Sequence, residues 1–463
     1  MTGELARPTA WASGDNSLRR ATTPTHFPLL SHRLPDAVFA YQHGKPVSVA
    51  HYLHDVERFS ASLAASGYVV ITCQNRYFFA VSLAAALLTK NISLMPSALT
   101  AEVLQQLDGI APNARMITDD DVARILVSTE HACALKHFEI PEIPSEQAVA
   151  WVFTSGSTGA PIPHVKTWGS LVKNVRVEAQ RLGMTDGRSH TIIGTVPPQH
   201  MYGFESTVLV AMQSGCALCA ERPFYPADIC STLAVIPRPH LLVTTPFHLH
   251  ALLAAEIEIP PFDLVVSATA PLSPELAQQS EMRLHIPIIE IYGCTETGQV
   301  ATRYPTRSPE WQLFDGVHFN VENGQIWAAG GHVEKMVAMQ DELELRGDDR
   351  FVLHGRSADM VNIAGKRSSL AYLTNQLKAI PGVIDAIFFM PDEADIDRVT
   401  RLAAFVVAPT LDATSVTKAL RSRIDAVFLP RPICFVDTLP RTATGKLPRQ
   451  ALTALLALHS KKV

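Results

Sequence analysis

The chain has 463 residues, more than one hydrophobic core usually organises, so we expect two or more domains of roughly 100 to 200 residues each. Hydrophobic residues make up 47% of the sequence and charged residues 18%, which is typical of a chain with a large buried core and excludes a disordered one. The formal net charge is −5 and no basic run exceeds two residues, so the sequence predicts no nucleic-acid partner.

Membrane and disulfide signals are weak throughout the sequence. The longest apolar run, residues 77–88, is shorter than the roughly 18 residues that cross a bilayer, and no basic-then-apolar signal pattern opens the chain. We therefore expect no membrane span and a cytoplasmic protein. The seven cysteines are scattered and odd in number, which favours reduced thiols over a disulfide framework. Cys216 and Cys219 form a single CxxC without further ligands, so we predict no zinc site there.

Segments typical of strands and of helices alternate along much of the chain. Strand-like runs lie at residues 68–72, 92–95, 191–196, 241–244, 264–267 and 288–291, and helix-like segments lie at 47–66, 77–90 and 100–107. This alternation predicts an α/β fold with parallel sheets. Each strand-like run ends at a polar or Gly/Pro-rich loop. Ligands of parallel sheets bind at the carboxyl ends of the strands, so we expect the functional site at these loops.

The pattern changes twice toward the C-terminus. Short strand-like segments at residues 323–327 and 350–353 carry hairpin-like turns, Glu322-Asn323-Gly324 and Gly347-Asp348-Asp349, which predict a small β-rich lobe. After Gly355 a smaller α+β pattern begins, with helices at 370–380 and 415–427 and strands at 386–390, 402–407 and 433–436. We therefore predict a large N-terminal domain of layered α/β sheets with this lobe, residues 1–356, and a small C-terminal domain, residues 357–463.

A glycine- and hydroxyl-rich segment directly follows the apolar run 148–153 and is a candidate phosphate loop. Its residues are Thr154, Ser155, Gly156, Ser157, Thr158 and Gly159. Glycine permits positive φ and close backbone approach, so N–H groups and hydroxyls can surround a polyphosphate. The segment is neither a Walker loop nor a GxGxxG fingerprint. An ordinary Ser/Gly turn is the alternative when these residues are taken alone.

Together with Pro161, this segment resembles the phosphate loop of the adenylate-forming superfamily, which includes acyl- and aryl-CoA synthetases, luciferases and adenylation domains of peptide synthetases. Four further segments resemble that family in the correct order. They are residues 267–272 (SATAPL), the run Tyr292-Gly293-Cys294-Thr295-Glu296, Gly355-Arg356 with Asp359, and Arg441-Thr442-Ala443-Thr444-Gly445-Lys446. Five ordered matches between about residues 67 and 449 identify the chain as a member of this superfamily.

The resemblance implies a role for each matched residue. Adenine lies against Ala270, Tyr292 and Gly293, phosphate contacts come from Thr295, and Arg356 belongs to the nucleotide site. Glu296 holds Mg²⁺, for which one carboxylate suffices when phosphates supply the other ligands. Lys446 binds ATP and stabilises charge in the reaction. Ala358 and Asp359 form a hinge about which a mobile C-terminal domain rotates, and Gly365, Lys366 and Arg367 contact the acyl acceptor.

Spacing and position single out two further residues. The family's ribose-binding Asp precedes the Gly-Arg pair by a strand, a turn and a strand. Asp341 lies far enough upstream for this arrangement, whereas Asp348 sits at the hairpin tip. His200 follows the strand-like run 191–196, where the family has an aromatic or His residue beside the carboxylate pocket, and a structural histidine is the alternative. Cys294 has no base partner, so we reject it as a nucleophile.

The sequence departs from the family pattern after the phosphate loop. The usual Pro-Lys-Gly is replaced by Pro161-Ile162-Pro163-His164-Val165-Lys166, so either Lys166 or His164 supplies the missing charge. Ala358 occupies the hinge position that is usually Asp or Lys. Lys446, Glu296 and Asp341 are retained, which favours an active enzyme over a non-catalytic nucleotide-binding subunit of a synthase.

The expected reaction is ATP-dependent activation of a carboxylic acid, with pyrophosphate release, followed by transfer of the acyl group to a thiol. The compact N-terminus and the run PIPHVKTW are similar to ligases of aryl-polyene and xanthomonadin pigment pathways. This resemblance implies a hydroxybenzoate-type substrate and the phosphopantetheine of an acyl carrier protein as acceptor. The alternative is an acyl-CoA or aryl-CoA synthetase that uses CoA. ATP and Mg²⁺ are the implied cofactors in either case.

Overall fold

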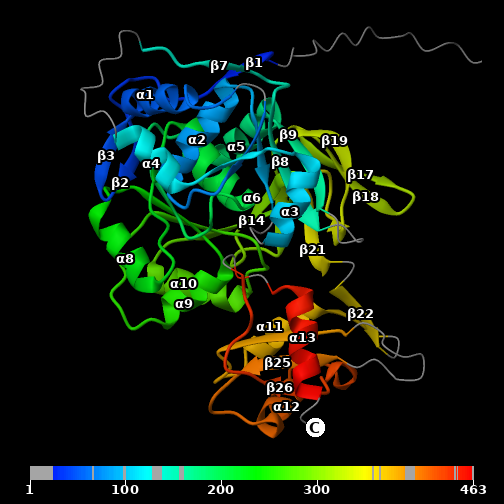
Figure 1. Cartoon of the computed structure of the whole chain (residues 1–463). Helices are drawn as coiled ribbons and strands as arrows, with labels where there is room; N and C mark the ends of the chain where they lie inside the picture. Colours follow the sequence, from blue (N-terminus) through cyan, green and yellow to red (C-terminus); the bar gives the residue numbers. More distant parts are fainter. Residues whose placement is uncertain are drawn as a thin grey trace, which may run out of the picture.

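The computed structural model describes residues 24–64, 67–96, 101–127, 138–155, 161–356, 359–363, 366–391, 402–442, 445 and 447–460. A large N-terminal part carries a smaller C-terminal part beneath it (Figure 1). The expected α/β architecture is therefore confirmed. Within these residues no helix is both long and apolar enough to cross a membrane.

The largest sheet has eleven strands and is parallel through its centre. In order its strands are β20 (Asp341–Leu345), β21 (Arg350–Arg356), β16 (Glu310–Leu313), β15 (Gly298–Arg303), β14 (Ile288–Cys294), β13 (Leu264–Ser267), β12 (His240–Thr244), β10 (Thr191–Gly194), β11 (Ala217–Cys219), β2 (Val38–Gln42) and β3 (Lys45–Ser48). Strands β14, β13, β12, β10, β11 and β2 run parallel, so the loops at their carboxyl ends meet at one edge.

A second sheet has five strands, β6 (Arg115–Ile117), β4 (Tyr68–Ile71), β5 (Ile92–Met95), β8 (Ala148–Ser155) and β9 (Pro161–Thr167). The first four are parallel, and β9 pairs antiparallel with β8 at the edge of the sheet. Pro161 and Pro163 are tolerated in β9 because an edge strand does not need every N–H for pairing. A short ladder, β1 (His26–Pro28) with β7 (Glu142–Pro144), lies apart from this sheet.

Helices connect the strands and cover the sheets. They are α1 (Val49–Ser60), α2 (Arg76–Leu88), α3 (Ala101–Ile110), α4 (Asp119–Val127), α5 (Trp168–Arg181), α6 (Met201–Gly203), the π-helix η1 (Phe204–Leu209), α7 (Val210–Ser214), α8 (Pro226–Val235), α9 (Pro246–Ala254) and α10 (Pro274–Leu284). The helix predicted at 47–66 begins later, because residues 45–48 form β3 and the Ser48 side chain accepts the His51 N–H as the N-cap of α1.

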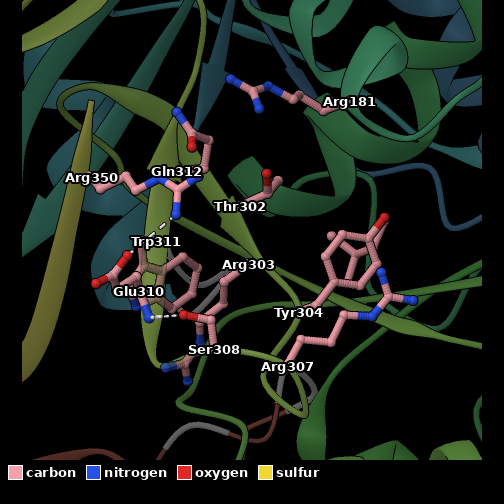
Figure 2. A pocket seen from close by; sticks show the side chains of 11 residues that line it. Arg181, Thr302, Arg303, Tyr304, Arg307, Ser308, Glu310, Trp311, Gln312 and Arg350 are labelled. Carbon is pink, nitrogen blue, oxygen red and sulfur yellow. Dashed lines mark hydrogen bonds and ion pairs between the residues drawn. The ribbon is translucent and has the colours of Figure 1, made fainter. Parts of the chain in front are cut away.

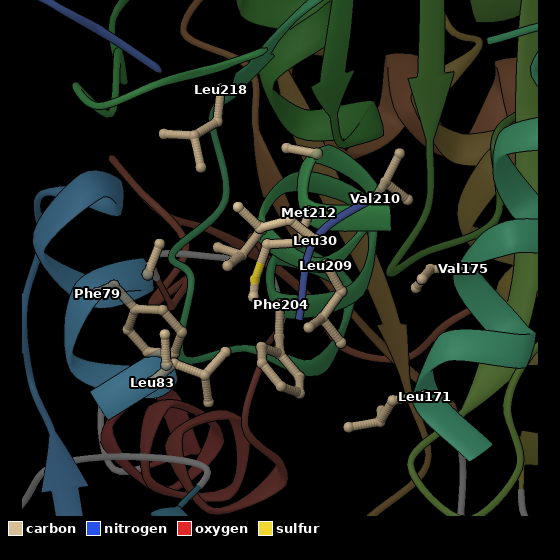
Figure 3. Packing of buried hydrophobic residues seen from close by; sticks show 14 of the residues in the cluster. Leu30, Phe79, Leu83, Leu171, Val175, Phe204, Leu209, Val210, Met212 and Leu218 are labelled. Carbon is tan, nitrogen blue, oxygen red and sulfur yellow. The ribbon is translucent and has the colours of Figure 1, made fainter. Parts of the chain in front are cut away.

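The core of the large part surrounds the continuous helix formed by α6, η1 and α7. Its side chains Phe204, Leu209, Val210 and Met212 are buried and pack toward α2 and α5, as Figure 3 shows. On those helices the buried partners include Phe79, Leu83, Leu171 and Val175. This helix is buried on all sides, including its polar residues Glu205, Ser206, Thr207 and Gln213. Polar groups on it must therefore find partners inside the protein, which matters for Glu205 below.

The β-rich lobe is a three-stranded antiparallel sheet of β17 (Val317–Glu322), β18 (Gln325–Gly330) and β19 (Val333–Ala338). The predicted turn between its first two strands is confirmed, with Asn323 at φ 51° and Gly324 at φ 79°. Two successive positive φ values are the pattern that an Asn-Gly hairpin favours. The second predicted turn joins β20 to β21.

The small C-terminal part has two sheets and its own apolar core. Its elements are β22 (Met360–Ile363), β23 (Lys366–Ser369), α11 (Leu370–Lys378), β24 (Asp385–Phe389), β25 (Ala403–Val407), α12 (Ala413–Arg421), the 3₁₀ helix η3 (Ala426–Phe428), β26 (Ile433–Phe435) and α13 (Arg449–Ser460). The helix predicted at 415–427 is shorter, since α12 ends at Arg421 and η3 follows separately. A domain boundary at residue 356 stays a prediction.

Candidate nucleotide and acyl-transfer site

The candidate phosphate loop begins at the carboxyl end of β8. Thr154 and Ser155 form the end of that strand, and Ser155 is in register with Pro161 at the start of β9. The side chains of Thr154 and Ser155, and the whole of Gly156, Ser157, Thr158 and Gly159, lie outside the described residues. The β8–β9 ladder therefore holds both ends of the predicted loop.

Two expected nucleotide contacts, Tyr292 and Asp341, lie together in the structure. The Tyr292 hydroxyl donates to Asp341 Oδ2 at 2.5 Å, which joins the end of β14 to the start of β20. In the β20–β21 ladder Asp341 pairs with Arg356, whose backbone therefore lies beside it, although the Arg356 side chain lies outside the described residues. Gly293 faces the next strand so closely that a Cβ would lie 2.3 Å from Gly298 O. Only glycine fits there.

Thr295 and Glu296 form the turn between β14 and β15. Both are half-buried, and the Glu296 carboxylate is 34% exposed. His164 Nε2 on β9 lies 3.7 Å from Glu296 Oε1. In the described part of the chain, no group of three or more His, Cys, Asp or Glu side chains could hold a metal. An accessible single carboxylate fits Mg²⁺ that is bound mainly by nucleotide phosphates.

Lys166 lies beneath the same turn. Its side chain is buried, with 6% exposed, and Nζ donates to Glu296 O at 2.9 Å. Burial lowers the pKa of Lys166, while the charge of Glu205 and, less strongly, those of Glu296 and Glu334 oppose that shift. Burial likewise lowers the pKa of His164, against the charge of Glu296.

Two carboxyl groups are buried behind this turn, on η1 and α5. Burial raises the pKa of Glu205 to about 7, although Lys166 and a 2.6 Å hydrogen bond from Asn174 Nδ2 oppose the shift. Burial raises the pKa of Glu178 to about 8. When the Gln299 amide is oriented to satisfy both neighbours, its nitrogen donates to Glu178 Oε2 at 2.8 Å. Sequence reasoning missed both carboxyl groups, because glutamates in helices are usually surface residues.

The predicted adenine turn is anchored by a buried carboxylate. Glu290 Oε1 accepts the Leu272 N–H at 2.8 Å, and Glu290 Oε2 pairs with Arg303 at 2.7 Å. Within the turn, Thr269 has φ 78°, a left-handed conformation that is rare for a β-branched residue, and Ala270 is exposed. Sequence reasoning also missed this anchoring pair, Glu290 and Arg303. Their only signal is an acidic residue inside the strand predicted at 288–291.

A cavity of about 270 Å³ adjoins this anchor on the side of Arg303 (Figure 2). Trp311 lines it beneath the Arg303 guanidinium, 4.5 Å from the ring centroid, and also contacts the Tyr292 ring at 5.5 Å. Arg307 lies over Tyr304 at its rim. Two residues that line the cavity therefore also support residues near the predicted nucleotide site: Arg303 pairs with Glu290, and Trp311 packs against Tyr292.

His200 lies just after β10, at the carboxyl edge of the parallel strands. Its Nδ1 accepts the Tyr202 N–H at 3.3 Å as the N-cap of α6. A neutral ring with this bond carries its proton on Nε2. The geometry accommodates both the structural and the substrate-binding roles.

The loop that carries Lys446 faces the large part of the protein. Lys446 itself lies outside the described residues, but its neighbour Gly445 has φ 80° and approaches Phe247 of α9, where a Cβ would lie 3.0 Å from Phe247 Cβ. Arg441 stabilises the loop by donating to Gly445 O at 2.6 Å and to both Asp385 oxygens at 2.6 and 2.7 Å. Burial alone raises the pKa of Asp385, but Arg441 and Lys378 bring it below its usual value.

The predicted hinge and acceptor residues lie between β21 and α11. Ala358 and Gly365 fall outside the described residues, as does the Arg367 side chain, and Asp359 is half-buried just before β22. Lys366 is exposed and forms an ion pair with Asp425. Asp425 lines a cavity of about 430 Å³ together with Ser368, Tyr372, Arg421, Ser422, Arg423, Ile424 and Phe428.

The cysteines in the described part of the chain show no sign of a chemical role. In the described segments six cysteines are free thiols, including Cys216 and Cys219. Burial raises the pKa of Cys294 to about 11, which keeps its thiol protonated at neutral pH and disfavours a nucleophilic role. His248 is a buried residue whose pKa falls to about 4 because of desolvation.

Comparison with known proteins gives consistent matches along both parts of the chain. The AMP-binding enzyme model matches residues 76–323, and the AMP-binding enzyme C-terminal domain model matches residues 375–446. A 4-coumarate--CoA ligase of Rhodobacter capsulatus is 30% identical over 317 residues, covering 67% of this chain and 78% of the relative. A 3-hydroxybenzoate--CoA/4-hydroxybenzoate--CoA ligase of Thauera aromatica is 25% identical, covering 70% and 71%.

Solved structures show the same fold. ATP-bound MatB from Rhodopseudomonas palustris superposes with a TM-score of 0.77 at 18% identity, covering 91% of this chain and 97% of that one. The o-succinylbenzoate CoA synthetase MenE of Bacillus subtilis, in complex with its acyl-adenylate intermediate, also gives 0.77 at 18% identity, covering 93% and 98%. The model matches and the ligase relatives together establish that the chain belongs to the AMP-binding enzyme family.

Proposed function

We propose that this chain activates a carboxylic acid as its acyl-adenylate and then transfers the acyl group to a thiol. The observation that carries the proposal is the convergence of Tyr292, Asp341 and the Glu296 turn at one edge of the large sheet, with the Gly445 loop facing that part of the protein. The family membership and the names of the ligase relatives support it.

In the first half-reaction a carboxylate oxygen of the acid attacks the α-phosphorus of ATP. The bond from that phosphorus to the bridging oxygen breaks, and pyrophosphate leaves with the electron pair. Tyr292 and Asp341 orient the nucleoside, and Lys446 stabilises negative charge on the entering and bridging oxygens. Glu296 would hold Mg²⁺, which would supply positive charge to neutralise the phosphates.

In the second half-reaction a thiol attacks the acyl carbonyl, and AMP leaves as the thioester forms. Lys446 must withdraw so that the thiol can enter. We place the pivot at Ala358 and Asp359, between a large domain of residues 1–356 and a small domain of residues 357–463. The left-handed Gly355, at φ 133°, precedes that pivot and permits backbone angles that other residues resist.

The substrate we propose is an aryl acid such as a hydroxybenzoate. Two relatives are named for aromatic acids, coumarate and hydroxybenzoate, and the run PIPHVKTW resembles ligases of aryl-polyene and xanthomonadin pigment pathways. We also propose that His200, at the carboxyl edge of the parallel strands, contacts the carboxylate of the acid, as the family resemblance implies.

The acceptor we propose is the phosphopantetheine thiol of an acyl carrier protein. This proposal rests on the resemblance to the pigment-pathway ligases. Arg421 and Arg423 line the small-domain cavity and give it positive charge that suits an acidic partner, and Lys366 pairs with Asp425 beside them. The second candidate is CoA, because the relatives are named as CoA ligases and the same cations suit its phosphates.

The test is pyrophosphate exchange into ATP over a panel of aryl and fatty acids, followed by transfer to CoA and to holo carrier protein. Exchange with aryl acids and faster loading of the carrier support the full proposal. Release of acyl-CoA far faster than carrier loading overturns the carrier acceptor. Nucleotide binding without exchange for any acid favours the non-catalytic alternative.

A further inference from the structure

On strand β9 apolar side chains are exposed and basic side chains are buried or half-buried, which is the reverse of the usual pattern. Val165 is exposed, at 56%, and Pro163 is exposed, whereas His164 between them is half-buried and Lys166 beyond them is buried. Side chains two residues apart share a face of a strand, so the basic residues point inward together. A local rule broken in this way is expected mainly at functional sites.

The Lys166 ammonium is compensated on two sides. Its Nζ donates to the backbone oxygen of Glu296, and the buried carboxyl group of Glu205 interacts with it electrostatically. Glu205 is fixed in turn by Asn174, whose Nδ2 donates to Glu205 Oε1 at 2.6 Å. Because an isolated buried charge is very costly, the lysine and the glutamate depend on each other.

The same Glu205–Asn174 pair also lies against the far end of the turn. A Cβ on Gly298 would lie 2.7 Å from Asn174 Nδ2 and 2.8 Å from Glu205 Oε1, and Gly298 has φ 75°. The turn that carries Glu296 therefore packs against these two side chains at Gly298 and is hydrogen-bonded to Lys166 at Glu296.

We infer that Lys166 is a positioning residue for Glu296: from β9 it fixes the turn that presents the Glu296 carboxylate, with Glu205 as its buried counter-charge. β9 leaves the phosphate loop in one sheet, and the turn joins β14 to β15 in the other. Lys166 thus couples the two segments that bind the phosphates and their Mg²⁺. Since Nζ is bonded inward to the Glu296 carbonyl, it does not serve as a replacement for the family's phosphate-loop lysine.

This inference rests on the proposed function. The test below distinguishes a failure of the inference about Lys166 from a failure of the proposed function. ATP binding is measured by calorimetry across a range of Mg²⁺ concentrations, with no acid present, for the wild type, Lys166→Met, Glu205→Gln and the double variant. Methionine keeps the length of lysine without its charge or its hydrogen bond. Lys335→Met, on the exposed face of β19, is the matched control.

We expect Lys166→Met to need about tenfold more Mg²⁺ for half-maximal ATP binding and to melt at lower temperature, because Glu205 loses its counter-charge. The double variant should regain the wild-type melting temperature and keep the raised Mg²⁺ requirement, since the Glu296 carbonyl still lacks its donor. The Lys335 control should match the wild type in both measurements.

An unchanged Mg²⁺ requirement in Lys166→Met overturns the inference. So does a double variant whose Mg²⁺ requirement returns to the wild-type value, because the lysine would then act only through stability. If the wild type binds Mg-ATP yet forms no adenylate, the proposed activity is rejected, but the comparison of Mg²⁺ requirements still tests the role of Lys166. If the wild type binds no Mg-ATP, both the proposed activity and the role of Lys166 are overturned.

Discussion

Tyr292 and Asp341, 49 positions apart in the chain, are joined by a hydrogen bond of 2.5 Å from the phenol to the carboxylate. The Tyr292 ring is held from behind by Trp311 and Phe351, each with its centroid 5.5 Å away. The proposed adenine and ribose contacts therefore form one rigid unit. A substitution of one residue should alter the position of the other.

Replacing Tyr292 with Phe keeps the ring packing and removes the hydrogen bond to Asp341. A hydrogen bond to a charged group contributes about 1.5 to 3 kcal/mol, so we expect the KM for ATP to rise roughly tenfold or more. The KM for the acid should stay within about twofold. Steady-state exchange kinetics measure both constants. Tyr304→Phe, at the neighbouring cavity, is the control, and an equal rise in both constants would argue against a nucleotide-specific role.

Gly445→Ala tests whether the loop of the small domain must fit against α9. The substitution places a methyl group at φ 80° and 3.0 Å from Phe247 Cβ. The backbone strain of about 1 to 2 kcal/mol lowers stability. The contact with Phe247 in addition opposes the position in which the loop faces α9, and for that reason we expect adenylation to slow by about tenfold. Thioester formation from added acyl-adenylate should be far less affected.

Gly347→Ala is the matched control for that loop variant. Gly347 has φ 82°, but a Cβ there meets nothing within 4 Å. It should show comparable backbone strain and near-normal adenylation. Equal losses of adenylation in both variants would show that Gly445→Ala acts only through general destabilisation.

Lys446→Ala should lower the rate of adenylation by about 10² to 10³, because an aimed cation stabilises the charge that develops at the α-phosphate. Thioester formation from preformed adenylate should change little, since in the proposed mechanism the lysine leaves the site before the thiol enters. Rapid-quench measurement of each half-reaction separates the two rates. Equal losses in both half-reactions would contradict this division of roles.

Glu178→Gln should change how stability depends on pH. The pKa of Glu178 is raised to about 8 in the fold, whereas the ordinary value is 4.5. Between those values the unfolded chain releases a proton that the folded chain keeps, so stability falls as pH rises, by about 1.4 kcal/mol per unit. The amide resembles the protonated carboxyl group, so the variant should match the wild type near pH 5 and be more stable near pH 8.

Urea or thermal unfolding at several pH values between 5 and 8 measures this slope. Glu258→Gln, at an exposed loop position, is the control and should follow the wild type. Parallel pH profiles for the wild type and Glu178→Gln would show that the buried carboxyl group titrates near its ordinary pKa after all.

Much of the fold was accessible from sequence because its signals are local. The alternation of apolar strands with helices predicted the parallel sheets, and Asn323-Gly324 predicted its hairpin from turn chemistry. The choice of Asp341 over Asp348 rested on the length of two strands and a turn, which the β20–β21 ladder matches. Its role at the ribose stays a prediction.

Other features depend on partners that are distant in sequence. β9 was not predicted as a strand, because prolines such as Pro161 and Pro163 are typical of loops. In a sheet they are tolerated here because β9 is an edge strand. Without that strand the inward face of Lys166 could not be seen, nor could its partners Glu296 and Glu205, which come from other elements. The Glu290–Arg303 anchor likewise needs the β14–β15 register.

The most direct test of the central claim is acid-dependent exchange of labelled pyrophosphate into ATP by the purified wild-type chain. The proposed chemistry predicts exchange that requires both Mg²⁺ and an aryl acid, with AMP and pyrophosphate as the products once a thiol is added. Acid-dependent turnover that yields ADP and phosphate, or the absence of exchange with every acid although Mg-ATP binds, would contradict it.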